Sequence, residues 1–555
     1  MKTNYHVLTF RQLCDLEMIL NGSYHPLSTF MNSLDYYSVV SNLELSNGDF
    51  FPVPIVLDLP ESEASLLDIG DQLILTNSEN LPIASMTIDS LFKPDLKNEC
   101  LKVLNTDDLN HPYVKFLLDR NYITYYVSGP MIEMNPIIHY DFRALRKKPD
   151  EIKKMFQTRK WSTIIGFQTR NPIHKCHYEM TLHTMNKLSS SDNETKLLIT
   201  PTVGVSQECD IDYYTRVQCY LSILNKYPSN STELVLLPLS MKMAGPREAL
   251  LHAIVRKNYG CTHFIIGRDH AGPSYKPSDT SKKSFYEPYE AHHLAIKYQD
   301  KLGINILLMN EMVYVSNRNQ YVPIDQLTLT DQCETISGTK LREMLESNQL
   351  IPNWYTFPEI SNILRNSVKT PKQTGICVYF IGLSGSGKST LVKCLKTQLM
   401  EYNLYNRKIT ILDADEIRQN LSKGLGFSAE DRSINVRRIG YVASLIVKHG
   451  GICLVANIAP YEIDREYNRK LIRNDGLYYE VYVNTPLNKC KERDCKGLYQ
   501  KASQNLIKLT GVNDPFEIPI VSDLVIENND VVDLELTNNK IISFLLENRY
   551  ISTFT

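Results

Sequence analysis

The hydrophobic positions of the chain change their spacing several times, and each change predicts a different kind of element. Apolar residues repeat at helical spacing over 13–20, after Thr9-x-x-Gln12, which has the form of a capping box, and Asn21-Gly22 ends the run. From about residue 50 to residue 102 the apolar runs are short and bounded by polar and glycine positions, which is typical of strands. The expected strands are 52–57, 72–75 and 82–88. The chain therefore opens with a short helix and a small, barrel-like β module.

Between residues 162 and 309 short apolar runs alternate with segments of helix length. The runs are 162–167, 196–200, 234–237, 263–266 and 304–309. Such alternation predicts βαβ units around a parallel sheet. A polar stretch over 367–374 then precedes the apolar run 376–381, so we expect a domain boundary near residue 371 and a second α/β domain after it. The predicted fold class is a multidomain α/β chain.

Composition limits the classes of protein that fit. The chain has 555 residues, of which 43% are hydrophobic and 22% are charged, as in an ordinary soluble protein of several domains. Whole-chain disorder, collagen and coiled coils are poor fits. With 60 Lys+Arg against 62 Asp+Glu the net charge is -2, which gives no bulk attraction to nucleic acid or an anionic membrane. We predict neither as a partner, so any anion binding must be local.

The twelve cysteines are scattered and form no C-x-x-C pair, so neither a disulfide scaffold nor a zinc knuckle is indicated. The first residues are too polar for a secretory signal and too poor in arginine for a transit peptide. No apolar run reaches the ~18 residues that a spanning helix needs. The sequence predicts a cytoplasmic protein.

A phosphate-binding loop is the most complete motif. Residues 382–389 match G-x-x-x-x-G-K-[ST] and lie between an apolar strand and an expected helix over 389–401. Glycines let backbone N–H groups turn toward phosphate, a lysine adds charge, and a serine hydroxyl can reach Mg²⁺. The residues expected in these roles are Gly382, Gly385, Gly387, Lys388 and Ser389.

Polar residues downstream extend this site. Asp413, at the end of the expected strand 409–412, is suited to hold a metal ion or to accept a proton from an attacking hydroxyl. Asp415 fits such a role and a helix N-cap equally well. A basic cluster with one asparagine suits a second anionic substrate, although each arginine alone could be an ordinary surface charge. Its members are Arg418, Arg432, Asn435, Arg437 and Arg438.

A second constellation, Q-T-R-N-P-x-H-x-x-H, follows the expected strand 162–167 directly. His174 and His177 are three residues apart, so they share one helical face, where the helix N-terminus can help to hold a polyphosphate. Gln168 and Arg170 flank Thr169 and can point together toward a small oxyanion. The two histidines with Cys176 could instead bind a metal, but further ligands at a convincing spacing are lacking, and we predict no protein-bound metal. They could also be ordinary half-buried histidines.

The expected strand 263–266 ends in Gly267-Arg268-Asp269-His270-Ala271, a polar, glycine-bounded turn. In parallel sheets the ligand crevice lies at the carboxyl ends of the strands. The segment could also be a simple turn. Two such strand ends in one sheet predict one site of nucleotide size.

Together with residues 13–22, 241–248 and 336–339, these strings resemble fungal-type ATP sulfurylases over essentially residues 1–370. The resemblance implies a PUA-like N-terminal domain (1–140) and a Rossmann-like nucleotidyltransferase domain (141–370). It also implies that ATP, with Mg²⁺, and sulfate are converted to adenylyl sulfate (APS) and pyrophosphate, the first step of sulfate assimilation toward cysteine and methionine. A homohexamer built as a dimer of trimers is the implied assembly.

The same resemblance implies roles for individual residues. The sulfate contacts are Gln168, Arg170 and the backbone of Ala271. The catalytic residues are Thr169, Arg170, Asn171, His174 and His177. The ATP contacts are Gln168, Arg170, Gly267, Arg268, Asp269, His270 and Val313.

Residues 382–519 resemble APS kinases, with the phosphate-binding loop and the strings 413–418, 425–432 and 496–499 in the family's order. This third domain, expected over 371–555, departs from the kinases at several positions, which are Ala414, Glu416, Asn457, Ala459 and Leu509. The departures are similar to the regulatory domain of filamentous fungal ATP sulfurylases, which binds the kinase product PAPS and usually has a damaged loop.

The resemblance thus implies a PAPS-binding allosteric domain, and the intact loop keeps open the alternative of a kinase that phosphorylates APS. The nucleotide site would comprise the loop residues with Asp413, Arg418, Arg432, Asn435, Ile458 and Lys496.

Overall fold

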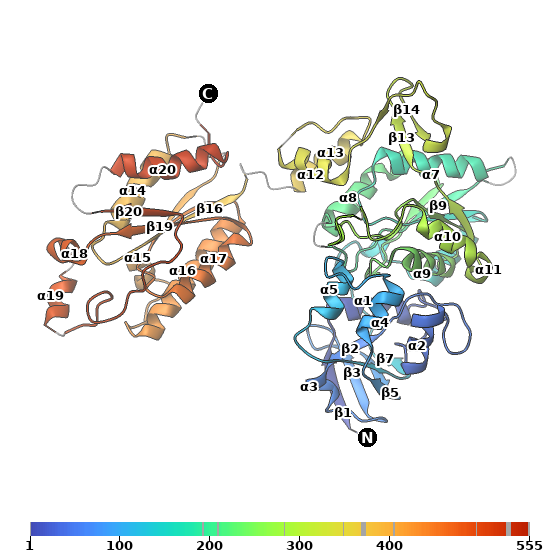
Figure 1. Ribbon diagram of the computed structural model, residues 1–555, viewed down its shortest axis with the longest axis horizontal. Helices are drawn as coiled ribbons and strands as arrows, with labels where there is room; N and C mark the ends of the chain where they lie inside the picture. The colour runs from blue at the N-terminus through green and yellow to red at the C-terminus, as the bar shows by residue number, and fades with distance from the viewer. Residues whose placement is uncertain are drawn as a thin grey trace. The chain divides into compact units, whose positions relative to one another are not determined.

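The computed structural model describes residues 2–552 except 191–193, 208–209, 282, 348, 368–372, 403, 405, 495–496, 505 and 529–533. The chain divides into two compact units (Figure 1). One comprises the chain up to residue 341 with 350–367, and the other comprises 342–349 with the chain from residue 368 on. The boundary expected near residue 371 lies outside the described residues. None of the described helices is long and apolar enough to span a bilayer.

The N-terminal part of the first unit is rich in short strands. Its first helix, α1 (Phe10–Leu20), begins with the predicted capping box, and Asn21 caps its end. A four-stranded sheet has the order β1 (Thr3–Val7), β3 (Gln72–Thr76), β4 (Pro82–Thr87) and β7 (Met131–Glu133). A three-stranded sheet has the order β2 (Leu57–Pro60), β6 (Thr124–Ser128) and β5 (Ser90–Phe92). The helices around them are α2 (Ser33–Asn42), α3 (Glu61–Ala64), α4 (Leu96–Val103) and α5 (Pro112–Leu118).

One expected strand is wrong. Residues 52–56 form no strand, and pairing begins only at Leu57. Pro52 and Pro54 have no backbone N–H to donate to a ladder, so this apolar segment is buried without joining a sheet.

The predicted βαβ sheet is present in the first unit. Its strands are all parallel, in the order β10 (Thr232–Leu234), β9 (Lys196–Ile199), β8 (Ile164–Phe167), β11 (His263–Ile266) and β12 (Asn305–Leu308). The helices that connect or flank these strands are α6 (Pro149–Arg159), α7 (Lys175–Leu188), α8 (Tyr213–Ile223), α9 (Gly245–Asn258), α10 (Glu290–Lys297) and α11 (Gln299–Leu302). Because β8 and β11 are neighbours, the two polar strand ends of the sequence lie at one edge of the sheet.

The chain continues with a small antiparallel sheet of β13 (Met312–Val315), β14 (Gln320–Pro323) and β15 (Cys333–Glu334). Helices α12 (Gly338–Glu346) and α13 (Pro358–Ser367) follow. Short 3-10 turns complete the elements of this part of the chain, at Arg143–Leu145, Leu224–Lys226 and Ile324–Gln326.

The second unit is a parallel sheet with helices on both faces. The strand order is β17 (Ile409–Asp413), β18 (Ile452–Ala456), β16 (Gly375–Ile381), β19 (Gly476–Asn484) and β20 (Leu524–Glu527). One face packs against α14 (Lys388–Leu399) and α20 (Leu534–Glu547), and the other packs against α16 (Ala429–Lys448) and α17 (Glu462–Arg473), as Figure 1 shows. The remaining helices are α15 (Ala414–Gln419), α18 (Leu487–Arg493) and α19 (Leu498–Ser503). Burial on both faces explains why β16 reads as one continuous apolar run.

Arg247, near the start of α9, ties the parallel sheet domain to the N-terminal helices. Its guanidinium donates to the carbonyls of Pro52 at 2.7 Å, Val40 at 3.0 Å and Lys102 at 2.9 Å, and also to that of Val39. The carbonyls of Val39, Val40 and Lys102 belong to the last turns of α2 and α4, where the helix dipole favours a cation. Burial lowers the pKa of Arg247 to about 10, so the side chain remains charged at neutral pH.

We predict that Arg247→Met lowers the free energy of unfolding of the first unit by about 2–4 kcal/mol, because several buried carbonyls lose a charged donor. Thermal and urea unfolding of the full chain measure the effect. Arg159→Met, at a partly exposed ion pair with Glu233, is the control and should change stability by less than about 1 kcal/mol. If the two variants were equally stable, the stabilising role of the Arg247 contacts would be wrong.

Candidate functional site

A cavity of about 350 Å³ lies at the carboxyl ends of β8 and β11. Most of the site residues expected in this part of the sequence line it. They are Gln168, Thr169, Arg170, Asn171, His177, Gly267, Arg268, Asp269, His270 and Ala271. The structure thus brings the two polar strand ends to one cavity, as the parallel sheet requires.

Two expected residues lie outside the lining. His174 is the N-cap residue of α7; it is buried, its Nδ1 lies 3.1 Å from the hydroxyl of Thr356, and its ring packs against Tyr355. Burial, reinforced by the neighbouring His177, lowers the pKa of His174 to about 3, so its imidazole is neutral. Val313 is a buried residue of β13.

Arg170 is held in place by several partners at the cavity. Its Nη1 lies 3.0 Å from both carboxylate oxygens of Asp210, and its Nη2 donates to the carbonyl of Gly272 at 2.9 Å. The side chain of Asp210 is almost completely buried, so this ion pair is little screened by water. The guanidinium is therefore a fixed cation at the strand end, already opposed by one carboxylate.

Helix α8 supports the turn that carries Thr169, Arg170 and Asn171. Arg216 donates to the backbone carbonyl of Arg170 at 2.7 Å, and the hydroxyl of Tyr220 donates to the carbonyl of Asn171. Within the turn, the Asn171 N–H donates to the hydroxyl oxygen of Thr169 at 3.1 Å. The carbonyls of the turn are thus fixed against α8.

On the neighbouring strand end, Ala271 has a left-handed backbone conformation with φ 56°. A non-glycine residue in this region is strained, and such residues cluster at functional sites. Its carbonyl accepts the N–H of Gly245, which fixes this turn to the start of α9.

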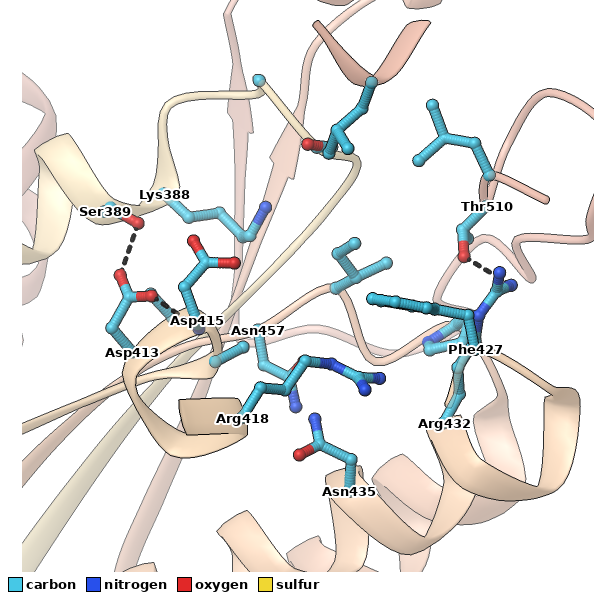
Figure 2. A pocket seen from close by; sticks show the side chains of 18 of the residues that line it. Lys388, Ser389, Asp413, Asp415, Arg418, Phe427, Arg432, Asn435, Asn457 and Thr510 are labelled. Atoms are coloured by element: carbon cyan, nitrogen blue, oxygen red, sulfur yellow. Dashed lines mark hydrogen bonds between the residues drawn. The ribbon is translucent and has the colours of Figure 1, made fainter. Parts of the chain in front are cut away.

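A second and larger cavity, of about 1080 Å³, lies above the carboxyl ends of β16, β17 and β18 (Figure 2). Of the residues expected there, Gly385, Gly387, Lys388, Ser389, Asp413, Arg418, Arg432, Asn435 and Ile458 line it. Gly382 precedes the lining residues at the start of the loop, and Lys496 lies outside the described residues.

The loop end of this cavity has the features that the motif predicts. Gly385 and Gly387 have φ of 74° and 99°, values that L side chains rarely adopt. Lys388 donates to the carbonyls of Gly382 at 2.9 Å and Leu383 at 2.7 Å. The Ser389 hydroxyl donates to Asp413 at 2.7 Å, as Figure 2 shows.

Asp413, and not Asp415, is the residue that caps the following helix. Asp413 is the N-cap of α15, and its carboxylate accepts the N–H of Asp415 at 3.0 Å. Asp413 therefore combines the structural role of a cap with a contact to the loop serine Ser389.

The opposite end of the cavity carries the basic residues. Arg432 donates to the Thr510 hydroxyl at 2.9 Å and is paired with Asp514, while Arg418 lies 4.5 Å from the ring of the exposed Phe427. Asn435 is 3% exposed, and its Oδ1 accepts no hydrogen bond among the described residues. Figure 2 shows Arg418 and Asn435 directed toward the middle of the cavity.

Two of the predicted basic residues face elsewhere. Arg437 pairs with Asp464 at 2.7 Å, Arg438 donates to the carbonyl of Leu421, and neither lines the cavity. These two arginines are therefore ordinary surface or ion-paired side chains, the alternative given for each arginine of the cluster.

Three families match successive parts of the chain. PUA-like domain matches residues 2–136, ATP-sulfurylase matches residues 143–367 and Adenylylsulphate kinase matches residues 374–527. Sulfate adenylyltransferases of Neurospora crassa and Gibberella zeae are 41% and 39% identical to the chain over 525 and 524 residues, covering 94% of this chain and 90% and 89% of theirs. The chain belongs to the sulfate adenylyltransferase family.

One solved structure matches the whole length of the chain. A hexameric APS kinase from Thiobacillus denitrificans matches with a TM-score of 0.75 and 28% identity, covering 100% of this chain and 94% of that chain. The predicted family and fold class are confirmed: a PUA-like domain, a sulfate adenylyltransferase domain and a kinase-like domain with a phosphate-binding loop.

In this sulfate adenylyltransferase family member, sequence reasoning missed the residues that hold the cavity motif in place. Asp210, Arg216 and Tyr220 contact the motif from 40 to 49 positions away. His252 and Arg256, on α9, contact Gln168 from 84 and 88 positions away. The only available signal was that α9 carries charged residues within a segment that is otherwise apolar and buried.

Metal binding by His174, His177 and Cys176 is the alternative that the sequence leaves open. No group of three His, Cys, Asp or Glu side chains is placed to hold a metal ion within the part of the chain that the structure describes. Cys176 instead interacts with His177. Burial opposes the Cys176 thiolate, but the adjacent His177 outweighs this effect and lowers the pKa of the thiol below its ordinary value of 9.0.

Burial likewise opposes the charged form of His177, yet Cys176 raises its pKa above the ordinary value.

We predict that alkylation of Cys176 by iodoacetamide reaches its full rate at a lower pH than expected for an ordinary thiol, and that ATP slows it because Cys176 lines the cavity. Peptide mass spectrometry follows the reaction. The exposed Cys333 is the control, which ATP should not protect. Alkylation of Cys176 that is indifferent to ATP would contradict this placement.

Proposed function

We propose that this chain catalyses adenylyl transfer from ATP to sulfate, giving APS and pyrophosphate. The observation that carries the proposal is the convergence of Gln168 to Asn171 and Gly267 to Ala271 on one cavity at the ends of two adjacent parallel strands. A cavity of about 350 Å³ is within the range of small-molecule sites. ATP enters as its Mg²⁺ complex, so the metal ion arrives with the substrate.

Positioning is the main task of such a site, because sulfate is a poor nucleophile and repels the triphosphate. Gln168, Arg170 and the Ala271 backbone hold sulfate, and sulfate competes with Asp210 for the Arg170 guanidinium. The sulfate oxygen attacks the α-phosphorus, and the electron pair of the breaking bond passes to the bridging oxygen of pyrophosphate. Asn171 and His177 stabilise the growing charge, with Thr169 shaping the turn. No covalent intermediate with the protein is needed.

The remaining expected residues keep their proposed roles around this step. Gly267, Arg268, Asp269, His270 and Val313 contact ATP. His174 supports catalysis as the N-cap at the start of α7, where the helix N-terminus favours an anion.

We predict that Arg170→Ala lowers kcat/KM for sulfate by about 10²- to 10³-fold or more, since a charged donor is lost from a preorganised site. Sulfate-dependent pyrophosphate release measures it. Arg159→Ala, a partly exposed arginine of α6, is the control and should keep the activity of the unmodified protein. Near-normal pyrophosphate release by Arg170→Ala would overturn the assignment of sulfate binding.

For the third domain we propose a regulatory role in which PAPS binds the larger cavity and changes the activity of the adenylyltransferase site. The cavity offers Arg418, Arg432 and the Oδ1 of Asn435, which has no partner among the residues that the structure describes, while Leu509 replaces the aromatic residue expected for stacking on adenine. Binding without turnover needs complementarity to the ligand but no transition-state stabilisation.

One observation favours the second candidate, an APS kinase. Ser389 and Asp413 are hydrogen-bonded at the end of the intact loop, where Mg²⁺ and the γ-phosphate of ATP would be held. Lys388 lines the same end of the cavity.

We predict that PAPS makes the sulfate saturation curve sigmoidal, and that no PAPS forms when labelled ATP and APS are supplied. Both are measured on the full chain, with Arg432→Ala expected to abolish the PAPS effect. Lys470→Ala, at an exposed position of α17, is the control. Formation of PAPS that is lost in Lys388→Ala would instead establish the kinase.

We propose domain bounds of 1–140, 141–370 and 371–555, a homohexamer built as a dimer of trimers, and a location in the cytoplasm. APS and pyrophosphate are the products released, and neither nucleic acid nor membrane is a partner. Size-exclusion chromatography with light scattering tests the assembly.

A further inference from the structure

Four side chains at the adenylyltransferase cavity form one continuous line of hydrogen bonds. Arg256 donates from Nη2 to Oε1 of Gln168. Nε2 of Gln168 lies 3.3 Å from Nε2 of His252, and Nδ1 of His252 lies 3.0 Å from Nε2 of His270. Arg256 and His252 are completely buried, and Gln168, His252 and His270 line the cavity.

Arg256 determines which atoms donate and which accept along this line. A guanidinium carries donors only, so the Gln168 atom facing Arg256 must be the oxygen. The amide nitrogen of Gln168 therefore faces His252 and donates to its Nε2. A ring nitrogen that accepts carries no proton, so neutral His252 is protonated at Nδ1 and donates to Nε2 of His270. By the same argument, His270 is protonated at Nδ1.

The reverse direction is excluded by the surroundings. Turning the Gln168 amide over would place its N–H₂ against the donors of Arg256, and a proton on Nε2 of His252 would face the amide N–H₂. The carboxylate of Glu248 lies 3.6 Å from Nε2 of His252, beyond hydrogen-bonding distance, and accepts the N–H groups of Lys242 and Ala244 instead.

Burial holds both histidines in the neutral form that this line requires. It lowers the pKa of His252, although Glu248 opposes the shift, and it lowers the pKa of His270 well below the ordinary value. A neutral imidazole has one donor and one acceptor nitrogen, so the order of protons along the line is unique.

Arg256 is itself fixed, so it cannot turn to another acceptor. Its Nε donates to the Thr200 hydroxyl at 3.0 Å, Nη2 to the Thr200 carbonyl at 3.2 Å, and Nη1 to the carbonyl of His252 at 3.3 Å. The guanidinium also lies 5.6 Å from the centre of the Phe264 ring.

We infer that Arg256 and His252 are positioning residues that set the tautomer of His270, so that His270 presents an Nδ1–H donor to an anionic oxygen of the bound substrate. No hydrogen bond to this nitrogen is found among the described residues, and the ring lines the cavity. The role in turnover rests on the proposed function, whereas the tautomer does not. Neither Arg256 nor His252 touches substrate in this scheme.

Two substitutions of His270 test which nitrogen is used. The amide nitrogen of asparagine can occupy the place of Nδ1, and that of glutamine the place of Nε2. We expect kcat/KM for ATP to be about tenfold or more higher in His270→Asn than in His270→Gln, the value of one hydrogen bond to a charged group. The opposite order, or equal losses, would overturn the inference.

Two substitutions of Arg256 test whether its guanidinium fixes the orientation of the Gln168 amide and, through it, the direction of the hydrogen bonds. Arg256→Lys keeps an obligate donor and should retain most of kcat/KM, whereas Arg256→Met should lose about tenfold or more for the folded protein. Arg247→Met, on the same helix and outside the line, is the matched control: it should lose stability but keep the kinetic constants. An Arg256→Met protein with unchanged kcat/KM would overturn the inference.

A spectroscopic measurement separates this inference from the proposed function. In the full chain labelled with ¹⁵N-histidine, solid-state NMR should show His270 protonated at Nδ1 and unprotonated at Nε2, with the signal identified by its loss in His270→Gln. The reverse tautomer would overturn the inference whether or not the protein releases pyrophosphate. Absence of sulfate-dependent pyrophosphate release would overturn the proposed function alone.

Discussion

The pairing of two neighbouring parallel strands, β8 and β11, is the constraint on which the adenylyltransferase site depends. Parallel strands end at the same edge, so residues 168–171 and 267–271, nearly a hundred positions apart, meet at one cavity. Each strand end is then fixed from behind: Arg216 and Tyr220 of α8 hold the first turn, and Gly245 of α9 holds the second. The site is therefore rigid because two helices support it, although its lining comes from loops.

Buried arginines without carboxylate partners are a second feature of this region. Arg247 is satisfied by backbone carbonyls, and Arg256 by Thr200, Gln168 and the carbonyl of His252. Neutral acceptors meet the hydrogen-bonding needs of a guanidinium without cancelling its charge. Arg170 differs because Asp210 opposes it directly. Arg256 thus adds positive charge beside the cavity without a carboxylate partner, while Arg170, the group assigned to sulfate, is already paired with Asp210.

Local patterns in the sequence predicted the elements and the lining, and long-range contacts explain what they left out. The capping box at Thr9, the parallel strands and the phosphate-binding loop all depend on residues close together in sequence. Asp210 and Arg256 act on residues dozens of positions away, and no periodicity records such a contact. The strand expected over 52–56 fails for a local reason. An apolar run predicts burial, but strand pairing also needs backbone N–H groups, which Pro52 and Pro54 lack.

The two cavities pose different problems of recognition, although both lie at the ends of parallel strands. In the larger one, the phosphate end is preorganised by Gly385, Gly387 and the Ser389–Asp413 contact, which serve binding and catalysis equally well. The distinction between a regulator and a kinase therefore lies at the other end, where Leu509 packs with Cys490 and Tyr499 in a small apolar cluster. A kinase must hold the acceptor hydroxyl in line with the γ-phosphate, whereas a regulator needs only affinity. An intact phosphate-binding loop is thus necessary for phosphoryl transfer, and the fit of the acceptor decides whether transfer occurs.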